Sequence, residues 1–128
     1  MPFETASQDL FVPTRAAGEA ALEAFAPRMG RQYANGRNYD RGAGAHKHVS
    51  MVSPYIRRRL LLEQDAIALA LDHHGPSGAE KFIQEVIWRG YFKGWLERRP
   101  MIWDSYRIGL ERDLAALDRD RGLRKAVA

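Results

Sequence analysis

Five side chains able to bind a ligand or take part in chemistry lie close together within residues 84–92. They are Gln84, Glu85, Trp88, Arg89 and Phe92, and they supply an amide, a carboxylate, a guanidinium and two aromatic rings. At 3.6 residues per helical turn, all five fall on or beside one line along a helix. The alternative is that Glu85 and Arg89 form an ordinary i,i+4 ion pair on a solvated face, which stabilises a helix by only about 0.2–0.5 kcal/mol.

The same line carries the charges of the helix that must position these groups. Charged residues recur every fourth position, at Lys81, Glu85, Arg89, Lys93 and Glu97. Nearly all of the remaining surface of this helix is apolar, with Phe82, Ile83, Val86, Ile87, Tyr91, Trp95 and Leu96. Because an ordinary surface helix has a single apolar stripe, this pattern predicts a helix that is buried on most faces.

A second group of side chains lies in a glycine-rich stretch, residues 29–48, where helical periodicity is lost. Four glycines and an Asn35-Gly36 turn signal predict an irregular loop of about twenty residues. Its cations alternate with aromatic rings, at Arg31, Tyr33, Arg37, Tyr39 and Arg41. Such a mixture can stack on bases and neutralise phosphates, and the alternative is a solvated, mobile basic loop.

A third candidate is the segment Ser50–Ile56, which has the composition of a helix start. Ser53 suits the N-cap position and Pro54 suits the first helical position. Backbone N–H groups and the hydroxyls of Ser50 and Ser53 could then face an anion. Capping without any ligand is the alternative.

The remaining periodic segments predict an all-α protein. A helix is expected from Pro13-Thr14 to Pro27, with Thr14 as the N-cap candidate. Further helices are expected from Glu63 to a stop at Gly75-Pro76, and from Asp104 or Ser105 to Asp118. No segment alternates as a strand would. We expect a leader arm over residues 1–13 and one helical domain over residues 14–128, which reads as the truncated first part of a larger domain.

Composition limits the possible partners and cofactors. Twenty Lys and Arg residues against sixteen Asp and Glu give a net charge of +4, which is compatible with a polyanionic partner. The absence of cysteine excludes disulfides and thiolate metal sites. The pairs His46/His48 and His73/His74 lack further ligands at a recognisable spacing, so no metal site is expected. Without a signal peptide or membrane span, we expect a cytoplasmic protein that does not associate with membranes.

Three elements, taken in order, resemble the helical FAD-binding domain of the photolyase and cryptochrome family. Tyr33 is followed four residues later by Arg37. Val49-Ser50-Met51-Val52-Ser53-Pro54-Tyr55-Ile56 resembles that family's Thr-Ser-x-Leu-Ser-Pro-Tyr-Leu phosphate loop. Phe82-Ile83-Gln84-Glu85-Val86-Ile87-Trp88-Arg89-Gly90-Tyr91-Phe92 is similar to its Phe-x-x-Glu-Leu-x-Trp-Arg-Glu-Phe helix. The resemblance covers residues 14–106.

The resemblance implies a site for FAD. Tyr33 and Phe82 would contact the cofactor, with Glu85 and Arg89 beside it. The segment Val49, Ser50, Met51, Val52 and Ser53 would wrap the diphosphate. Val49 replaces the family's usual Thr and removes one hydroxyl from this segment, and Gly90 replaces a common Glu.

The resemblance also implies a DNA partner that contains pyrimidine dimers. Arg37, Gln84, Trp88, Arg89 and Phe92 would contact the DNA, and Glu85 and Trp88 would be the catalytic residues at the flipped-out dimer. The implied reaction is light-driven electron transfer from reduced flavin, which splits the cyclobutane ring and returns the electron. The family's N-terminal α/β domain and the second half of its FAD domain have no counterpart in these 128 residues.

Two other functions are compatible with the same sequence. One is a cryptochrome-like flavoprotein that does not repair DNA. The other is a small, basic, helical nucleic-acid-binding protein without a cofactor, whose DNA binding would be sensitive to salt.

Overall fold

The computed structural model describes residues 11–128, and this part of the chain consists of helices and loops without strands. The prediction of an all-α protein is therefore confirmed. Within this range, the residues up to 90 form one unit and residues 91–128 form a second. Ten of the thirteen residues of the expected leader arm lie outside the described range. Among the described residues, no helix has the length and apolar character needed to cross a membrane.

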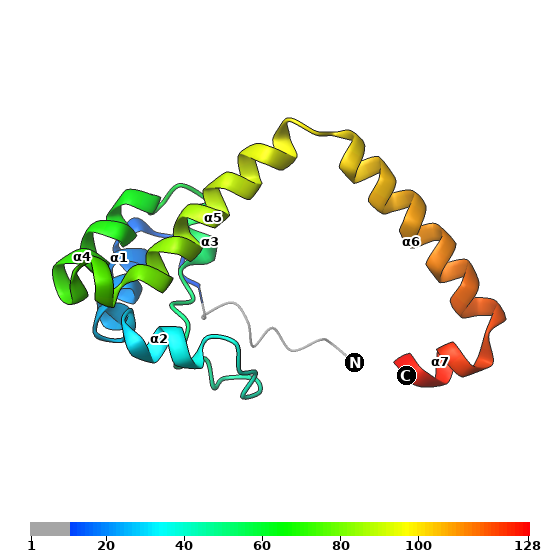
Figure 1. Ribbon diagram of the computed structural model, residues 1–128, viewed down its shortest axis with the longest axis horizontal. Helices are drawn as coiled ribbons and strands as arrows, with labels where there is room; N and C mark the ends of the chain where they lie inside the picture. Colours follow the sequence, from blue (N-terminus) through cyan, green and yellow to red (C-terminus); the bar gives the residue numbers. More distant parts are fainter. Residues whose placement is uncertain (1–10) are drawn as a thin grey trace. The chain divides into compact units, whose positions relative to one another are not determined.

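The first unit is built from several helices joined by loops (Figure 1). Its elements are α1 (Arg15–Phe25), the 3-10 helix η1 (Ala26–Arg28), α2 (Arg31–Gly36), α3 (Ser53–Arg57), α4 (Glu63–Gly78) and the first part of α5 (Glu80–Glu97). Thr14 caps α1 as expected, since its Oγ1 accepts a hydrogen bond of 3.2 Å from the Ala17 N–H. Gly75, at φ 68°, breaks the helical path of α4 where the Gly-Pro pair predicts a stop.

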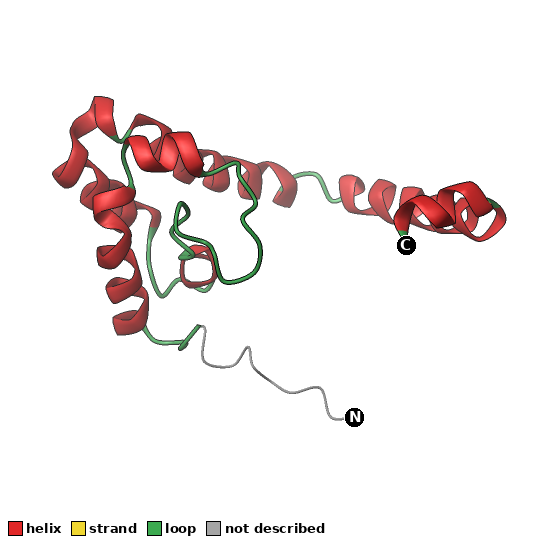
Figure 2. Ribbon diagram, turned by 90° about the horizontal axis from the view of Figure 1, so that it is seen from below, coloured by secondary structure: helices red, strands yellow, loops and turns green. Residues whose placement is uncertain are grey.

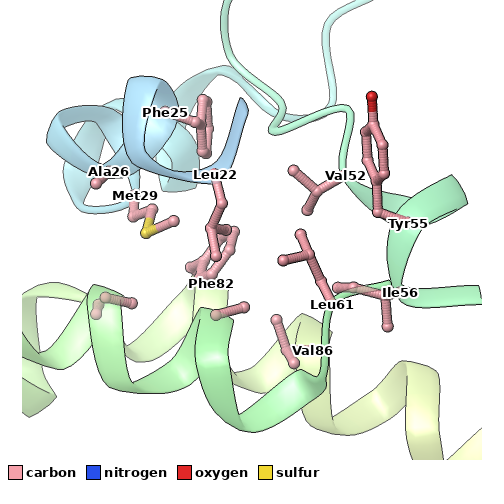
Figure 3. Packing of buried hydrophobic residues seen from close by; sticks show 13 residues of the cluster. Leu22, Phe25, Ala26, Met29, Val52, Tyr55, Ile56, Leu61, Phe82 and Val86 are labelled. Carbon is pink, nitrogen blue, oxygen red and sulfur yellow. The ribbon is translucent and has the colours of Figure 1, made fainter. Parts of the chain in front are cut away.

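The core of this unit draws apolar side chains from segments that are far apart in the sequence (Figure 3). Its larger members are Leu22, Phe25, Met29, Val52, Tyr55, Ile56, Leu61, Phe82 and Val86. Leu61 and Met29 are completely buried. Because these residues come from α1, α3, α5 and the connections between the helices, one core fixes all of these elements together.

Small residues on α4 let it lie close to the rest of the unit. Ala66 and Ala70 are spaced one helical turn apart on α4, and both are completely buried. Near the end of the helix, His74 Nε2 lies 2.7 Å from the backbone oxygen of Ala26. His74 is thus engaged with η1, which accounts for it structurally without a metal.

Two local predictions in the first unit are wrong. The expected loop over residues 29–48 contains the helix α2. The connection without helical structure is the segment 37–52, between α2 and α3 (Figure 2). Ser53 is the first helical residue of α3 and not its N-cap. Ser50 provides the local side-chain contact instead, accepting a hydrogen bond of 3.4 Å from the Val52 N–H.

The prediction that the helix around Glu85 is buried on most faces is also wrong. Only Phe82 and Val86 of α5 are buried, whereas Ile87 and Trp88 are at least half exposed. The buried pair lies four residues apart and therefore marks one stripe of the helix. Apolar periodicity gave the correct element but overestimated how many of its sides are covered.

The second unit comprises the end of α5, α6 (Met101–Arg119) and α7 (Arg121–Val127). Helix α6 begins earlier than expected, at Met101, and α7 is an element that was not expected. Asp120 explains α7, because its Oδ1 accepts hydrogen bonds from the N–H groups of Gly122 and Leu123. No residue from 91 to 128, all of which are described, is buried.

Candidate functional site

Tyr33 and Phe82, from two separate motifs, meet in an aromatic cluster of the first unit. Their ring centroids lie 5.2 Å apart in an edge-to-face arrangement, and Phe25 lies 6.2 Å from each ring. Helix α2 presents Tyr33 and helix α5 presents Phe82. Phe82 is only 3% exposed, so its ring belongs to the core, while Tyr33 is half-buried at the edge of the core.

Glu85 lies one turn after Phe82 and is held between two cations. Its Oε1 is 3.2 Å from Arg37 Nη1 and 3.6 Å from Lys81 Nζ. The pair with Arg37 joins α5 to the end of α2, so it is a tertiary contact as well as a charge pair. An ionised carboxylate in this setting can only accept hydrogen bonds.

The Tyr33 hydroxyl responds to the same charges. Burial raises the pKa of Tyr33 above its ordinary value, and the negative charge of Glu85 raises it further. Arg37 opposes both effects through its charge and a hydrogen bond. Tyr33 therefore carries its proton at neutral pH and is available as a donor.

The segment from Ser50 to Ser53 has an unusual backbone. Met51 adopts φ 57°, a left-handed conformation that is uncommon for a residue other than glycine. Val52 follows in the right-handed helical region with φ −93°, and its side chain is buried in the core. Successive residues of opposite hand are the backbone pattern found in anion-binding sites, and here the Val52 N–H donates to the Ser50 hydroxyl at 3.4 Å.

Arg89 connects this segment to α5. Its Nη2 donates a hydrogen bond of 3.3 Å to the backbone oxygen of Ser53. Val49 and Ser50, which complete the predicted phosphate loop, are partly buried beside it. The contact spans 36 positions of sequence and places the phosphate-loop candidate against the helix that carries Glu85.

The remaining predicted DNA-contacting residues differ in their surroundings. Trp88 is 50% exposed on the first unit, and Phe92, in the second unit, is 52% exposed. The Gln84 amide donates to Glu80 at 3.3 Å, and its oxygen accepts from Lys81 at 3.4 Å. Gln84 is therefore tied to the exposed first turn of α5.

A cavity that was not foreseen from the sequence lies within the loop after α2. Its volume is about 350 Å³, and its lining includes Arg37, Asn38, Tyr39, Arg41, His46 and His48. From the sequence, a metal role for these histidines was weighed against a place in a loop near a polyanion, and no metal site was expected. Among the described residues no group of three metal-binding side chains occurs. The signal that could have located the cavity is the His46-Lys47-His48 run, which follows Arg37, Tyr39 and Arg41 along one loop.

Comparison with known proteins found no match to any family model, any curated protein or any solved structure.

Proposed function

We propose that this chain is the FAD-binding segment of a photolyase-like flavoprotein that binds DNA containing pyrimidine dimers. One observation carries the proposal. The three motifs of the resemblance, separated by up to fifty positions, come together along one stretch of α5. Tyr33 contacts Phe82, Arg37 pairs with Glu85, and Arg89 binds the backbone of Ser53.

The residues present fit a dinucleotide at two points. The left-handed Met51 followed by the right-handed Val52, with the Ser50 hydroxyl beside them, is a backbone pattern that suits a diphosphate. The proton-bearing hydroxyl of Tyr33 supplies a donor at the edge of the core. Phe82 is too deeply buried for a wide ligand contact, so in this proposal it positions Tyr33.

Glu85 and Trp88 would act on the DNA side of the site. Glu85 offers an acceptor for the base edge of the dimer, and Arg37 and Lys81 complement its charge. The exposed indole of Trp88, one turn away, offers an aromatic surface to the flipped-out bases. Bound reduced FAD would supply light-driven electron donation, and the part of the chain is to bind, orient and exclude water.

The test begins with a titration of FAD into the purified 128-residue chain, followed by flavin fluorescence. Binding is expected, and the double substitution Ser50→Ala/Ser53→Ala should weaken it by about tenfold, since neither hydroxyl can then donate to the diphosphate. Ser105→Ala, on the exposed surface of α6, is the matched control and should bind FAD normally. A chain that leaves flavin fluorescence unchanged would overturn the proposal.

A second measurement addresses the reaction. Oligonucleotides that contain a thymine dimer should be repaired under blue light when reduced FAD is present, and Glu85→Gln and Trp88→Ala should each reduce the repair rate by at least about tenfold. Flavin binding without dimer splitting would instead identify a cryptochrome-like, non-repair flavoprotein.

A further inference from the structure

The loop between α2 and α3 lines the 350 Å³ cavity on the first unit, which is open to solvent on one side, and the loop is fixed at both ends. At its start, the Tyr39 N–H donates to Gly36 O at 3.2 Å. At its end, Arg28 Nη1 donates to Lys47 O at 3.1 Å, and the His48 ring packs on Gly36 so closely that a Cβ there would overlap it. The cavity is therefore a formed feature of the loop, and its lining extends to Val49, the first residue of the phosphate-loop candidate.

Nitrogen-bearing side chains outnumber carboxylates around this cavity. Two guanidinium groups and two imidazoles share its wall with one carboxylate, Asp40, which already accepts a hydrogen bond of 2.9 Å from the Gly42 N–H. Arg37 is paired with Glu85, but Arg41 forms no ion pair with any carboxylate in the described range 11–128. The guanidinium of Arg41 instead lies 5.7 Å from the ring centroid of Tyr39.

Two nitrogen atoms of cavity-lining residues lack hydrogen-bond partners although they are buried. They are Arg37 Nε and His48 Nδ1, the only such side-chain atoms found among the described residues. Buried polar atoms are nearly always hydrogen-bonded in folded proteins, so Arg37 Nε–H, which can only donate, lacks an acceptor here, whereas His48 Nδ1 lies against Gly36. Phosphate oxygens accept several hydrogen bonds each and favour arginine and histidine donors.

We propose that this cavity is a second phosphate-binding site, which holds a backbone phosphate of a nucleic-acid strand while a neighbouring base stacks on Tyr39. The phosphate would lie between Arg41 and His46, with Arg37 and His48 behind it. The Tyr39 ring is 68% exposed at the rim and can accept a base on its face. The proposal does not depend on flavin binding, because of the residues that line the cavity only Arg37 and Val49 also belong to the proposed flavoprotein site.

The experiment measures binding of a fluorescein-labelled oligothymidylate of about eight nucleotides by fluorescence anisotropy at several salt concentrations. Arg41→Gln/His46→Gln should weaken binding by about tenfold and lower the slope of log affinity against log salt by about 0.7 for each phosphate that the variant no longer neutralises. Tyr39→Ala should weaken binding about tenfold with the slope unchanged, because a stacked base carries no counterions. All three positions are exposed, so the fold should persist, as circular dichroism would verify.

Arg57→Gln is the matched control, since Arg57 is an exposed arginine on α3 that does not line the cavity. It should change affinity by less than about twofold. Equal effects of Arg57→Gln and Arg41→Gln/His46→Gln would overturn the proposal, as would a wild-type chain that does not bind the oligonucleotide at low salt.

A parallel arm with FAD identifies the source of the phosphate. If Arg41→Gln/His46→Gln weakens FAD binding and leaves oligonucleotide binding intact, the cavity holds a dinucleotide phosphate and its assignment to a nucleic-acid strand is overturned. Conversely, loss of FAD binding in Ser50→Ala/Ser53→Ala with normal oligonucleotide binding separates the two sites. Failure of the flavin proposal and failure of this one therefore give different results.

Discussion

Both units of this protein are helical, but they differ in how their helices are held. In the described part of the first unit, thirteen apolar residues are buried in one core, and hydrogen bonds join positions up to 48 residues apart. In the second unit no residue is buried, and exposed Trp103, Tyr106 and Leu114 lie along α6. Identical secondary structure thus rests on tertiary packing in one unit and on local interactions in the other.

The difference explains where a site can be built. Catalytic and binding groups need a surrounding structure that fixes their positions. Tyr33, Arg37 and Glu85 sit on elements that share the core, so their mutual distances are set by packing. The stacked pair Trp103 and Tyr106, with ring centroids 5.5 Å apart, is instead a contact within one helix.

The largest expected contrast comes from removing apolar volume in each unit. Leu61→Ala empties a completely buried position and should lower the free energy of unfolding by about 2–5 kcal/mol. Leu114→Ala changes a side chain that is 52% exposed on α6, and it should change the free energy of unfolding by less than about 0.5 kcal/mol. Urea unfolding followed by circular dichroism measures both, and equal decreases would contradict the difference between the units.

Adding a methyl group at a helical glycine should have opposite effects in the two units. At Gly18 in α1, a Cβ would lie 3.0 Å from the Tyr55 ring and 3.2 Å from Leu61, so Gly18→Ala should destabilise by about 1–3 kcal/mol. At Gly109 in α6 nothing lies within 4 Å, so Gly109→Ala should stabilise the helix by about 0.5–1 kcal/mol. Thermal unfolding of the two variants would show melting temperatures that move in opposite directions. A rise for Gly18→Ala would mean that α1 is packed less tightly than these distances indicate.

Ion pairs should follow the same division with smaller effects. Glu85→Gln removes the 3.2 Å ion pair between Arg37 at the end of α2 and Glu85 on α5. It should lower the free energy of unfolding by about 0.5–1 kcal/mol, because both side chains are mostly shielded from solvent. Glu97→Gln removes the 3.9 Å pair with Lys93, in which both groups are at least half exposed, and should cost no more than about 0.3 kcal/mol. A double-mutant cycle of Glu85→Gln with Arg37→Gln measures the coupling energy of this pair. A coupling energy near zero would show that the pair does not stabilise the folded state.

A fourth prediction concerns alkaline pH and the edge of the core. Because burial raises the pKa of Tyr33, the folded state retains this proton at a pH where the unfolded state has lost it. Stability from Tyr33 should therefore be fully present below the ordinary tyrosine pKa and decline as pH rises through the higher folded value. Phenolate absorbance should show a late-titrating component that is missing in Tyr33→Phe, and its persistence in that variant would assign it to another tyrosine.

Several features of the fold could be predicted from the sequence because they are local. Thr14 as a helix cap and Gly75-Pro76 as a break follow from the conformational preferences of single residues. Helix α2 was missed because glycine and asparagine lower helix propensity, while Tyr33 packs against Phe25 and Phe82 and supports the helix from outside it. The predicted N-cap of α3, Ser53, was wrong by one residue, because the N-cap is Val52. Val52 follows Met51, whose left-handed conformation could not be predicted from the sequence pattern.

For the candidate site, the sequence by itself determined which side chains could take part. The charged line on α5, the Tyr33 and Arg37 pair and the Ser50–Ser53 segment are visible as spacing and composition, because those depend on neighbouring residues only. The tertiary structure alone decided that Glu85 pairs with Arg37 in addition to Lys81, that Arg89 binds the Ser53 backbone, and that His46 and His48 share a cavity with Arg41. The reason is physical: these contacts join segments that only a common core brings together, and which faces a core covers depends on the packing of the whole unit.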